Sequence, residues 1–337
     1  MNSLERIKAA IRFRDTDRPP VIPQIFGHAA LFCDVPLLDY LRQGAILAAC
    51  QLKAQNHYGH DALFAFMDAC VESEALGSTL TFPADQYPDI GNYAFNRETD
   101  LQALEIPDPH RAGRMPELLK AITILREQAQ DDLPIVGCVL GPMTLSGQLL
   151  SLETALYLAI DETERFESLL DFCSQVAISF GIAQIRAGAH LPLIFEPAAC
   201  PEVIPKQFFR ELIAPRLKRI FTALKTAGSL ANWLHIAGQT ETILPFYPEM
   251  GVDIANFDYC VQPQTAQDLL PDTCLDGNLR PYGFVRGEPE AIRAETSALL
   301  EQFRGRGGFI LSSGCEIPLE ARPENIAAMV ECTRRRG

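Results

Sequence analysis

Short apolar runs bounded by turn residues recur along the chain, and they alternate with longer segments in which apolar residues repeat with helical spacing. None of the short runs alternates cleanly between apolar and polar residues, which is typical of parallel strands covered on both faces. The runs predict strands at residues 20–26, 61–67, 135–140, 191–195, 232–236, 253–257, 274–277 and 309–311. Helices are expected between them, at residues 38–55, 115–129, 154–187 (long enough for two), 206–226, 291–303 and 325–333.

Eight strands alternating with helices predict an α/β fold of the (β/α)8 TIM barrel type. We expect residues 1–337 to form a single such domain with an N-terminal helical extension. Residues 81–109, rich in Pro, Asp and Asn, predict an extended loop over the barrel mouth. An open doubly wound sheet is the alternative, but no Gly-x-Gly-x-x-Gly turn follows a strand to support its dinucleotide-binding form.

The amino-acid composition excludes some classes of binding partner for this chain. A net charge of −14 argues against nucleic acid, which needs a Lys/Arg surface, and against an anionic membrane. The ten cysteines are scattered without a Cys-x-x-Cys pair, which is typical of buried thiols in a reducing compartment. The most apolar long stretch, residues 143–160, contains Gln148 and Glu153 and falls short of a membrane span. We therefore expect a cytoplasmic protein.

Polar side chains follow nearly every predicted strand. In a barrel, the carboxyl ends of the strands form one mouth, where the chemistry takes place. The candidate residues at these ends are Gln24, His28, Asp68, Glu72, Glu74, Glu196, His235, Asp258, Asn278 and Cys315. Structural roles compete with functional ones, because the acidic residues could cap helices, Asn278 could form a turn, and Cys315 could be one more buried thiol.

Several short motifs, in this order along the chain, carry a family resemblance. They lie at residues 5–10, 17–21, 72–77, 141–144, 196–199, 277–279 and 314–318. With them the chain resembles the uroporphyrinogen decarboxylase superfamily, and within it the corrinoid-dependent methyltransferase branch that includes the methylcobamide:coenzyme M methyltransferases. The resemblance covers essentially the whole chain and implies a single barrel with its site in the C-terminal mouth.

The decarboxylase of this superfamily fits less well. The resemblance implies an Arg-rich segment after the first strand to bind a substrate with eight carboxylates, whereas residues 24–31 contain no Arg. Asp68 matches the decarboxylase's functional Asp, but Glu196 stands in place of its Ser and Cys315 in place of its His. A polyanionic substrate is therefore disfavoured.

The thiol-methylating members use zinc held by a His-x-Cys segment and a distant Cys. His235 and Cys315 match two of these metal ligands, but Ala237 stands in place of the third. In one interpretation Glu196, Asp258 or Glu72 replaces the missing ligand and the acceptor is a thiol. In the other, zinc is lost and the acceptor resembles tetrahydrofolate, whose nitrogen needs a proton donor or acceptor. The same three carboxylates are the expected catalytic groups, and the substrate-binding residues are expected to be Gln24, His28, Asp68, Glu74 and Asn278.

The resemblance thus implies a methyltransferase that exchanges a methyl group between a corrinoid and a small acceptor. The corrinoid (methylcobamide) is a co-substrate, and a separate corrinoid protein is the expected partner, because the chain has no Asp-x-His-x-x-Gly segment. The apolar stripe of residues 206–226 would allow a homodimer. The alternatives are uroporphyrinogen decarboxylase and a non-catalytic protein that binds a corrinoid or another ligand.

Overall fold

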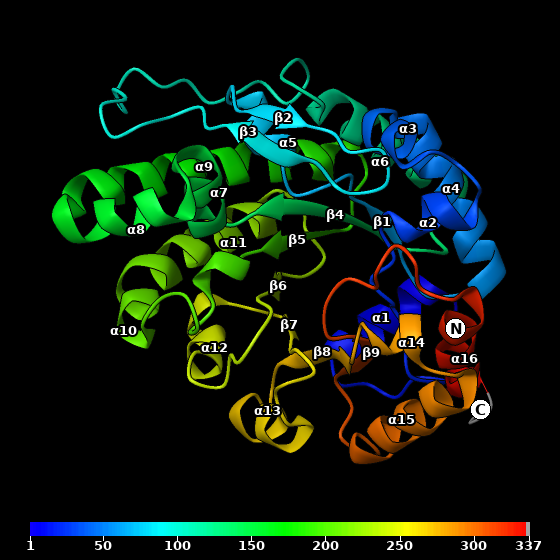
Figure 1. The fold of residues 1–337 in the computed structure, drawn as a ribbon. Coiled ribbons are helices and arrows are strands. Elements are labelled where there is room, and N and C mark those ends of the chain that lie inside the picture. Colours follow the sequence, from blue (N-terminus) through cyan, green and yellow to red (C-terminus); the bar gives the residue numbers. More distant parts are fainter. Residues whose placement is uncertain (335–337) are drawn as a thin grey trace.

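A computed structural model describes residues 1–334 and confirms the barrel prediction. Parallel strands follow one another around a curled sheet in the order β1-β4-β5-β6-β7-β8-β9, with helices outside (Figure 1). Their bounds are β1 Leu63–Ala65, β4 Ile135–Leu140, β5 Leu191–Phe195, β6 Trp233–His235, β7 Ile254–Asn256, β8 Cys274–Leu279 and β9 Phe309–Ser313. Seven of the eight predicted strands are therefore present, and β4 and β5 have the predicted bounds.

The prediction of a strand at residues 20–26 is wrong. It forms only an isolated parallel bridge, between Val21 and Leu311. Prolines at positions 19, 20 and 23 supply no backbone N–H, so a continuous ladder cannot form there. The segment still closes the barrel, because Ile22 N donates to Leu311 O at 2.8 Å on one side and Asp61 N donates to Val21 O at 2.8 Å on the other.

Two of the predicted helices differ from the structure, and the helix Pro142–Leu150 was not predicted. Residues 38–55 form two helices, and residues 206–226 are interrupted by a π-helical turn at Phe209–Ile213. Pro215 lacks an N–H and its ring crowds the preceding turn, which accounts for this interruption. The helices are α1 Ser3–Ile11, α2 His28–Phe32, α3 Leu37–Arg42, α4 Gly44–Tyr58, α5 Val71–Ala75, α6 Met115–Ala129, α7 Pro142–Leu150, α8 Leu152–Asp161, α9 Thr163–Ala187, α10 Lys206–Phe208, α11 Ala214–Thr226, α12 Tyr247–Met250, α13 Pro263–Leu269, α14 Gly283–Arg286, α15 Pro289–Gln302 and α16 Pro323–Arg334.

The segment 81–109 is also more ordered than an extended loop. Its first part pairs with the preceding residues in an antiparallel hairpin of β2 (Thr79–Thr81) and β3 (Asp89–Asn92). Tyr87, between these strands, accepts a hydrogen bond from Gly27 N at 2.9 Å and donates one to the Glu316 carboxylate. The hairpin loop thus reaches the mouth, as the sequence predicts.

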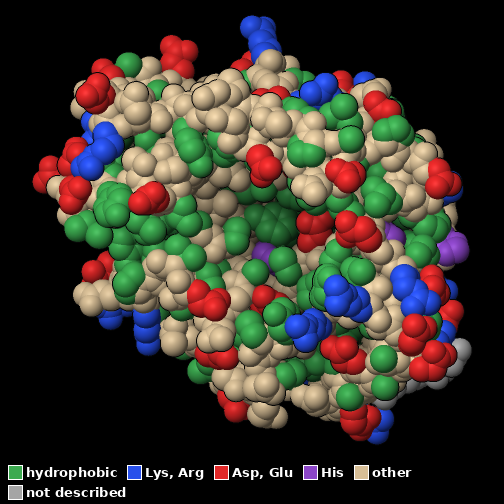
Figure 2. All heavy atoms as spheres, viewed as in Figure 1, with side chains coloured by type: hydrophobic (Ala, Val, Ile, Leu, Met, Phe, Trp, Pro, Cys, Tyr) green, Lys and Arg blue, Asp and Glu red, His purple; other side chains and the backbone are tan. Residues whose placement is uncertain are grey.

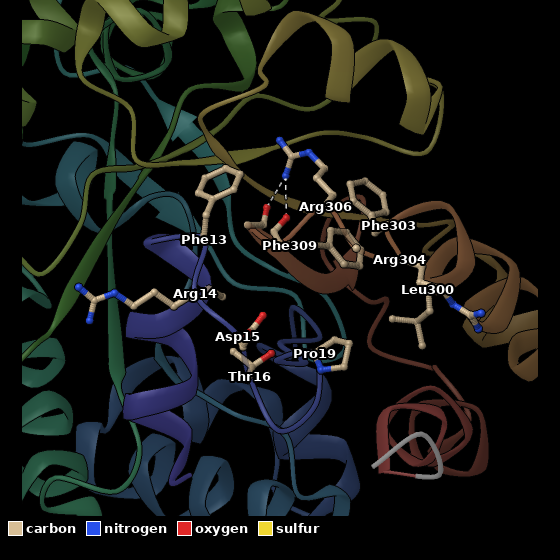
Figure 3. A pocket seen from close by; sticks show the side chains of 14 residues that line it. Phe13, Arg14, Asp15, Thr16, Pro19, Leu300, Phe303, Arg304, Arg306 and Phe309 are labelled. Carbon is tan, nitrogen blue, oxygen red and sulfur yellow. Dashed lines mark hydrogen bonds between the residues drawn. The ribbon is translucent and has the colours of Figure 1, made fainter.

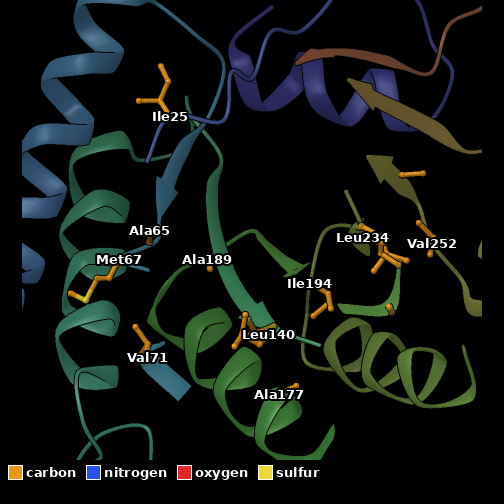
Figure 4. Close-up of a cluster of buried hydrophobic side chains, with 14 of the residues drawn as sticks. Ile25, Ala65, Met67, Val71, Leu140, Ala177, Ala189, Ile194, Leu234 and Val252 are labelled. Carbon is orange, nitrogen blue, oxygen red and sulfur yellow. The ribbon is translucent and has the colours of Figure 1, made fainter. Parts of the chain in front are cut away.

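Strand alternation separates two buried layers. Side chains of one parity, such as Phe64, Leu193 and Trp233, fill the barrel interior. The opposite parity packs against the surrounding helices, where Ala65, Met67, Ile194 and Ala177 contribute to the larger cluster (Figure 4). The interior between the two ends of the barrel is therefore packed with side chains.

Helix α9 is long and apolar enough to cross a membrane, judged by length and composition alone. In this structure 61% of its most apolar stretch is buried, and the helix packs against β4, α7 and α11. We therefore interpret α9 as a helix of the barrel's outer layer.

Candidate active site at the barrel mouth

The last inward-facing layer of the barrel forms the floor of the mouth. By strand parity Phe66 follows Phe64, Phe195 follows Leu193, and His235 follows Trp233. Figure 2 shows a hollow near the centre of this view, with hydrophobic side chains at its base, acidic side chains along one rim and a histidine beside it. The floor is thus aromatic on the β1 and β5 side.

Phe66 and Phe195 were missed as site residues in the sequence. Their ring centroids lie 5.3 Å apart, and Phe66 also lies 4.7 Å from Phe26. Phe26 is buried, whereas Phe66 and Phe195 keep part of their surface exposed. The available signal was parity, because each continues the inward face of its strand one layer beyond the packed interior.

His235 lies next to this aromatic pair. Its ring centroid is 4.8 Å from that of Phe195, and its Nδ1 has no hydrogen-bond partner among residues 1–334. Burial lowers the pKa of His235 to about 3, so the imidazole is neutral. His235, which we expected to bind a metal, thus lies in the mouth as an uncharged ring whose Nδ1 has no hydrogen bond to the described residues.

Glu72 stands at the aromatic side of the mouth. Its Oε1 accepts a hydrogen bond from Leu140 N at 2.8 Å. The residue also lines a cavity of about 10 Å³ together with Phe66 and Cys138, and Leu118 and Phe180 of the outer helices close its other side. Burial raises the pKa of Glu72 to about 7, against the opposing effect of the backbone hydrogen bonds. Near neutral pH this carboxyl can therefore accept or donate a proton.

Glu196 has a comparable pKa but a different setting. Its two oxygens accept hydrogen bonds from Met143 N at 2.7 Å and Thr144 N at 2.9 Å, at the N-terminus of α7. A Cβ at Gly141 would lie 2.4 Å from the Glu196 carboxyl carbon, so the backbone approaches closely because this position is Gly. Burial raises the pKa of Glu196 to about 7. The carboxyl is fully buried, and it anchors α7 to the end of β5.

Asp258 and Asn278 organise the loops after β6 and β7. Asp258 accepts hydrogen bonds from Gly238 N at 2.8 Å and Tyr259 N at 2.6 Å, and burial raises its pKa. Asn278 donates to the backbone oxygens of Asp258 and Val261, at 3.2 and 3.0 Å. Both oxygens of Asp258 are thus engaged with backbone N–H groups.

Asp68 and Glu74 share a buried cation. Arg114 donates to both oxygens of Asp68, at 2.5 and 3.1 Å, and to Glu74 at 2.6 Å. Arg114 lies just before α6, 46 residues beyond Asp68, and no local sequence pattern predicts this pairing. The two expected substrate-binding carboxylates are therefore held in an ion-pair network beside the mouth.

Gln24 and His28 are both buried. The ring nitrogens of His28 lie 3.0 Å from Leu319 O and 3.0 Å from Tyr58 Oη, so both already have partners. Gln24 donates its amide N–H to Ser313 O at 3.2 Å, while its Oε1 has no partner among the described residues. Of the two, Gln24 retains hydrogen-bonding capacity in the mouth layer.

The residues present do not fit the zinc site that the family resemblance implies. Cys315 is partly exposed, and burial raises the pKa of its thiol to about 12. Cys200, which the sequence analysis did not single out, lies near the 237–238 turn, since a Cβ at Gly238 would be 2.6 Å from its sulfur. Even so, no group of three or more His, Cys, Asp or Glu side chains within residues 1–334 is arranged to hold a metal ion.

A second cavity, of about 610 Å³, lies at the opposite end of the barrel, where β9 begins at Phe309 (Figure 3). Arg306 points across it and donates to the backbone oxygens of Gly308, Leu270 and Thr273 at 2.7 to 3.1 Å. Because the arginine is bound by the protein's own carbonyls, it stabilises this end of the fold. Chemistry is instead expected at the mouth.

Parallel strands that end in one mouth, with acidic, imidazole and aromatic side chains contributed by several of them, define the class of (β/α)8-barrel enzymes. The chain belongs to the uroporphyrinogen decarboxylase family, whose profile, described as Uroporphyrinogen decarboxylase (URO-D), matches residues 2–336.

Relatives confirm the predicted resemblance to the methyltransferase branch. The chain is 28% identical to the methylcobamide:CoM methyltransferase MtbA of Methanosarcina acetivorans, over 98% of this chain and 97% of the relative. A solved methyltransferase from Methanosarcina mazei superposes with a TM-score of 0.91 at 25% identity, covering 99% of each chain. A uroporphyrinogen decarboxylase of Anaeromyxobacter dehalogenans is 27% identical over 98% of this chain and 99% of its own length.

Proposed function

We propose that this enzyme exchanges a methyl group between a corrinoid and a small acceptor at the C-terminal mouth of the barrel. The observation that carries the proposal is the end-to-end similarity to methyltransferases of known structure and name, with matching barrel geometry. The MtbA relative is named for methylcobamide and CoM, and the corrinoid is the part of that chemistry we transfer to this chain. The corrinoid is a substrate here, delivered by a separate corrinoid protein in a cytoplasmic setting.

Within the mouth we assign the proton-transfer role to Glu72. It combines a position beside the partly exposed Phe66 with a pKa of about 7. Glu196 carries a similar pKa, but both of its oxygens accept backbone hydrogen bonds at α7, and both oxygens of Asp258 are likewise occupied by backbone N–H groups. In Glu72, which is also buried, Oε1 accepts the hydrogen bond from Leu140 N. Glu196 and Asp258 therefore shape the mouth, and Glu72 meets the substrate.

Anaerobic demethylation of methylcobalamin, followed by its visible spectrum with thiol and tetrahydrofolate acceptors, tests the proposal. We expect acceptor-dependent loss of the methylcobalamin spectrum with the native chain and a much slower change with Glu72→Gln. A spectrum that stays unchanged with every acceptor, and with a corrinoid protein as donor, would overturn it.

The similarity to decarboxylases keeps uroporphyrinogen decarboxylation as the second candidate. Residues 24–31 oppose it, because they contain no Arg and because His28 is bound to Leu319 and Tyr58. Incubation with uroporphyrinogen and analysis of the carboxyl number of the product separates the two functions. Stepwise loss of carboxylates at catalytic enzyme concentrations would favour the decarboxylase.

A further inference from the structure

The mouth lacks what a zinc-activated thiol acceptor requires. Two potential ligands, His235 and Cys315, remain, but Ala237 has no donor atom. The nearby Asp258 has both oxygens bound to backbone N–H groups, and no three-donor group exists within residues 1–334. A catalytic zinc normally needs three protein ligands and an open position. The acceptor must therefore be recognised by other features of the mouth.

The most distinctive of these features is the aromatic pair. Phe66 and Phe195 end two inward-facing rows, lie 5.3 Å apart, and remain partly exposed in a layer whose lower neighbours are fully packed. Exposed ring surface at the base of a hollow is a binding surface for another flat ring, because aromatic groups associate by offset or edge contacts. A small alkyl thiol would cover little of it.

Several buried polar atoms of residues 1–334 lack a partner, and two of them lie at inward-facing positions near the strand ends. His235 Nδ1 and Gln24 Oε1 are buried without a partner among the described residues, and the His235 ring is 4.8 Å from that of Phe195. A buried polar atom without a hydrogen bond costs free energy, so such atoms often mark the place of an absent partner. A heterocycle with N–H groups and ring nitrogens could provide partners that a thiol lacks.

We infer that the methyl acceptor is a nitrogen heterocycle of the reduced-pterin kind, whose flat pyrimidine ring stacks on Phe66 and Phe195, and that no zinc-bound thiolate takes part. This inference rests on the proposed methyl transfer, and it assigns the acceptor class of that same site.

The reaction balances without a metal at the acceptor. The lone pair of the heterocycle's secondary amine forms the new N–C bond while the Co–C bond of the methylcorrinoid breaks. Cobalt keeps the electron pair of that bond and leaves as Co(I). The amine proton passes to the Glu72 carboxylate, which together with Phe66 lines a cavity of about 10 Å³, the size of one water molecule.

Binding is measured first, without a corrinoid. The single tryptophan, Trp233, lies in the barrel interior two residues before His235, so its fluorescence reports on the mouth floor. Titration with tetrahydrofolate should quench this fluorescence saturably, and Phe195→Leu should weaken the apparent affinity about tenfold. Phe195→Tyr keeps the ring and should restore binding. Phe13→Leu, at the opposite end of the barrel, is the matched control, and urea unfolding of each variant checks that it is folded.

Turnover then separates the two hypotheses. We expect methylcobalamin demethylation with tetrahydrofolate, resistant to a zinc chelator, and none with 2-mercaptoethanesulfonate. Chelator-sensitive turnover with the thiol, or tetrahydrofolate affinity that Phe195→Leu leaves unchanged, would overturn the inference. Saturable, Phe195-dependent binding of tetrahydrofolate without any methyl transfer would support the ligand class and reject the proposed reaction instead.

Discussion

The inward-facing side chains differ between the two sides of the barrel. On the β1 and β5 side the last inward layer consists of Phe66 and Phe195, partly exposed, with Glu72 beside them. On the β7 to β9 side inward-facing positions are polar and fully buried, as in Asp276, which accepts a hydrogen bond from Asn256 at 3.0 Å. The first side keeps surface free for a ligand, whereas the second mainly stabilises the fold.

The largest effect should come from the ligand side. We expect Glu72→Gln to lower the rate of methyl transfer about 10²–10⁴-fold, because the amide cannot accept the proton. In the native enzyme the rate should rise with pH through about 7, since the ionised carboxylate is the base. Single-turnover spectra of methylcobalamin from pH 5.5 to 8.5 measure both. A flat pH profile in the native enzyme would contradict the assignment.

Asp276 tests the opposite side through stability. Burial raises its pKa to about 7, from an ordinary value of 3.8, so the folded state holds a proton that the unfolded chain loses. This contribution is fully present below about pH 4 and is lost as the pH rises through 7. The free energy of unfolding of Asp276→Asn should therefore exceed that of the native protein by on the order of 2 kcal/mol at pH 8. At pH 4 the two free energies should be equal.

Urea unfolding at the two pH values measures this difference. Asn256→Ala, which removes the partner of Asp276, is the companion variant and should destabilise at both. An Asp276→Asn variant that is less stable than the native chain at pH 8 would mean that the ionised carboxylate is favoured in the fold.

Substitution of Asp258 should have a smaller effect on the free energy of unfolding. Asp258→Ala leaves Gly238 N and Tyr259 N without their acceptor and should cost about 1–2 kcal/mol of unfolding free energy. Asp258→Asn retains one carbonyl oxygen and should lose less. A large fall in methyl-transfer rate with unchanged stability would instead move Asp258 to the catalytic groups.

The smallest expected change concerns metal content. Anaerobically purified native protein should contain far less than one equivalent of zinc, and His235→Ala and Cys315→Ser should not lower that amount. Elemental analysis of the three proteins, purified side by side, measures it. Stoichiometric zinc that both substitutions remove would restore the thiol-activating site, with Cys200 as the first candidate for the third ligand.

Sequence patterns predicted the barrel because strand and helix periods are local. They gave β4 and β5 their bounds, but they overestimated residues 20–26, where prolines break the ladder. The polar residues at the strand ends were identifiable as a set, yet their individual settings were not. Asp68 pairs with Arg114, which lies 46 residues further along the chain, so a local sequence pattern does not predict the pair. The exposure of Phe66 depends on which loops cover it, and this too does not follow from a local pattern.

The bridge between Val21 and Leu311 has a consequence for folding during synthesis of the protein. The two partners are separated by 290 positions, so the ring cannot close until nearly the whole chain has left the ribosome. At a synthesis rate of about 5–20 residues per second, the segment that contains Val21 is made on the order of 15–60 s before its partner Leu311. During synthesis β1 and the growing sheet have an open edge, a period in which chaperones or early packing of α1 would protect the nascent chain from aggregation.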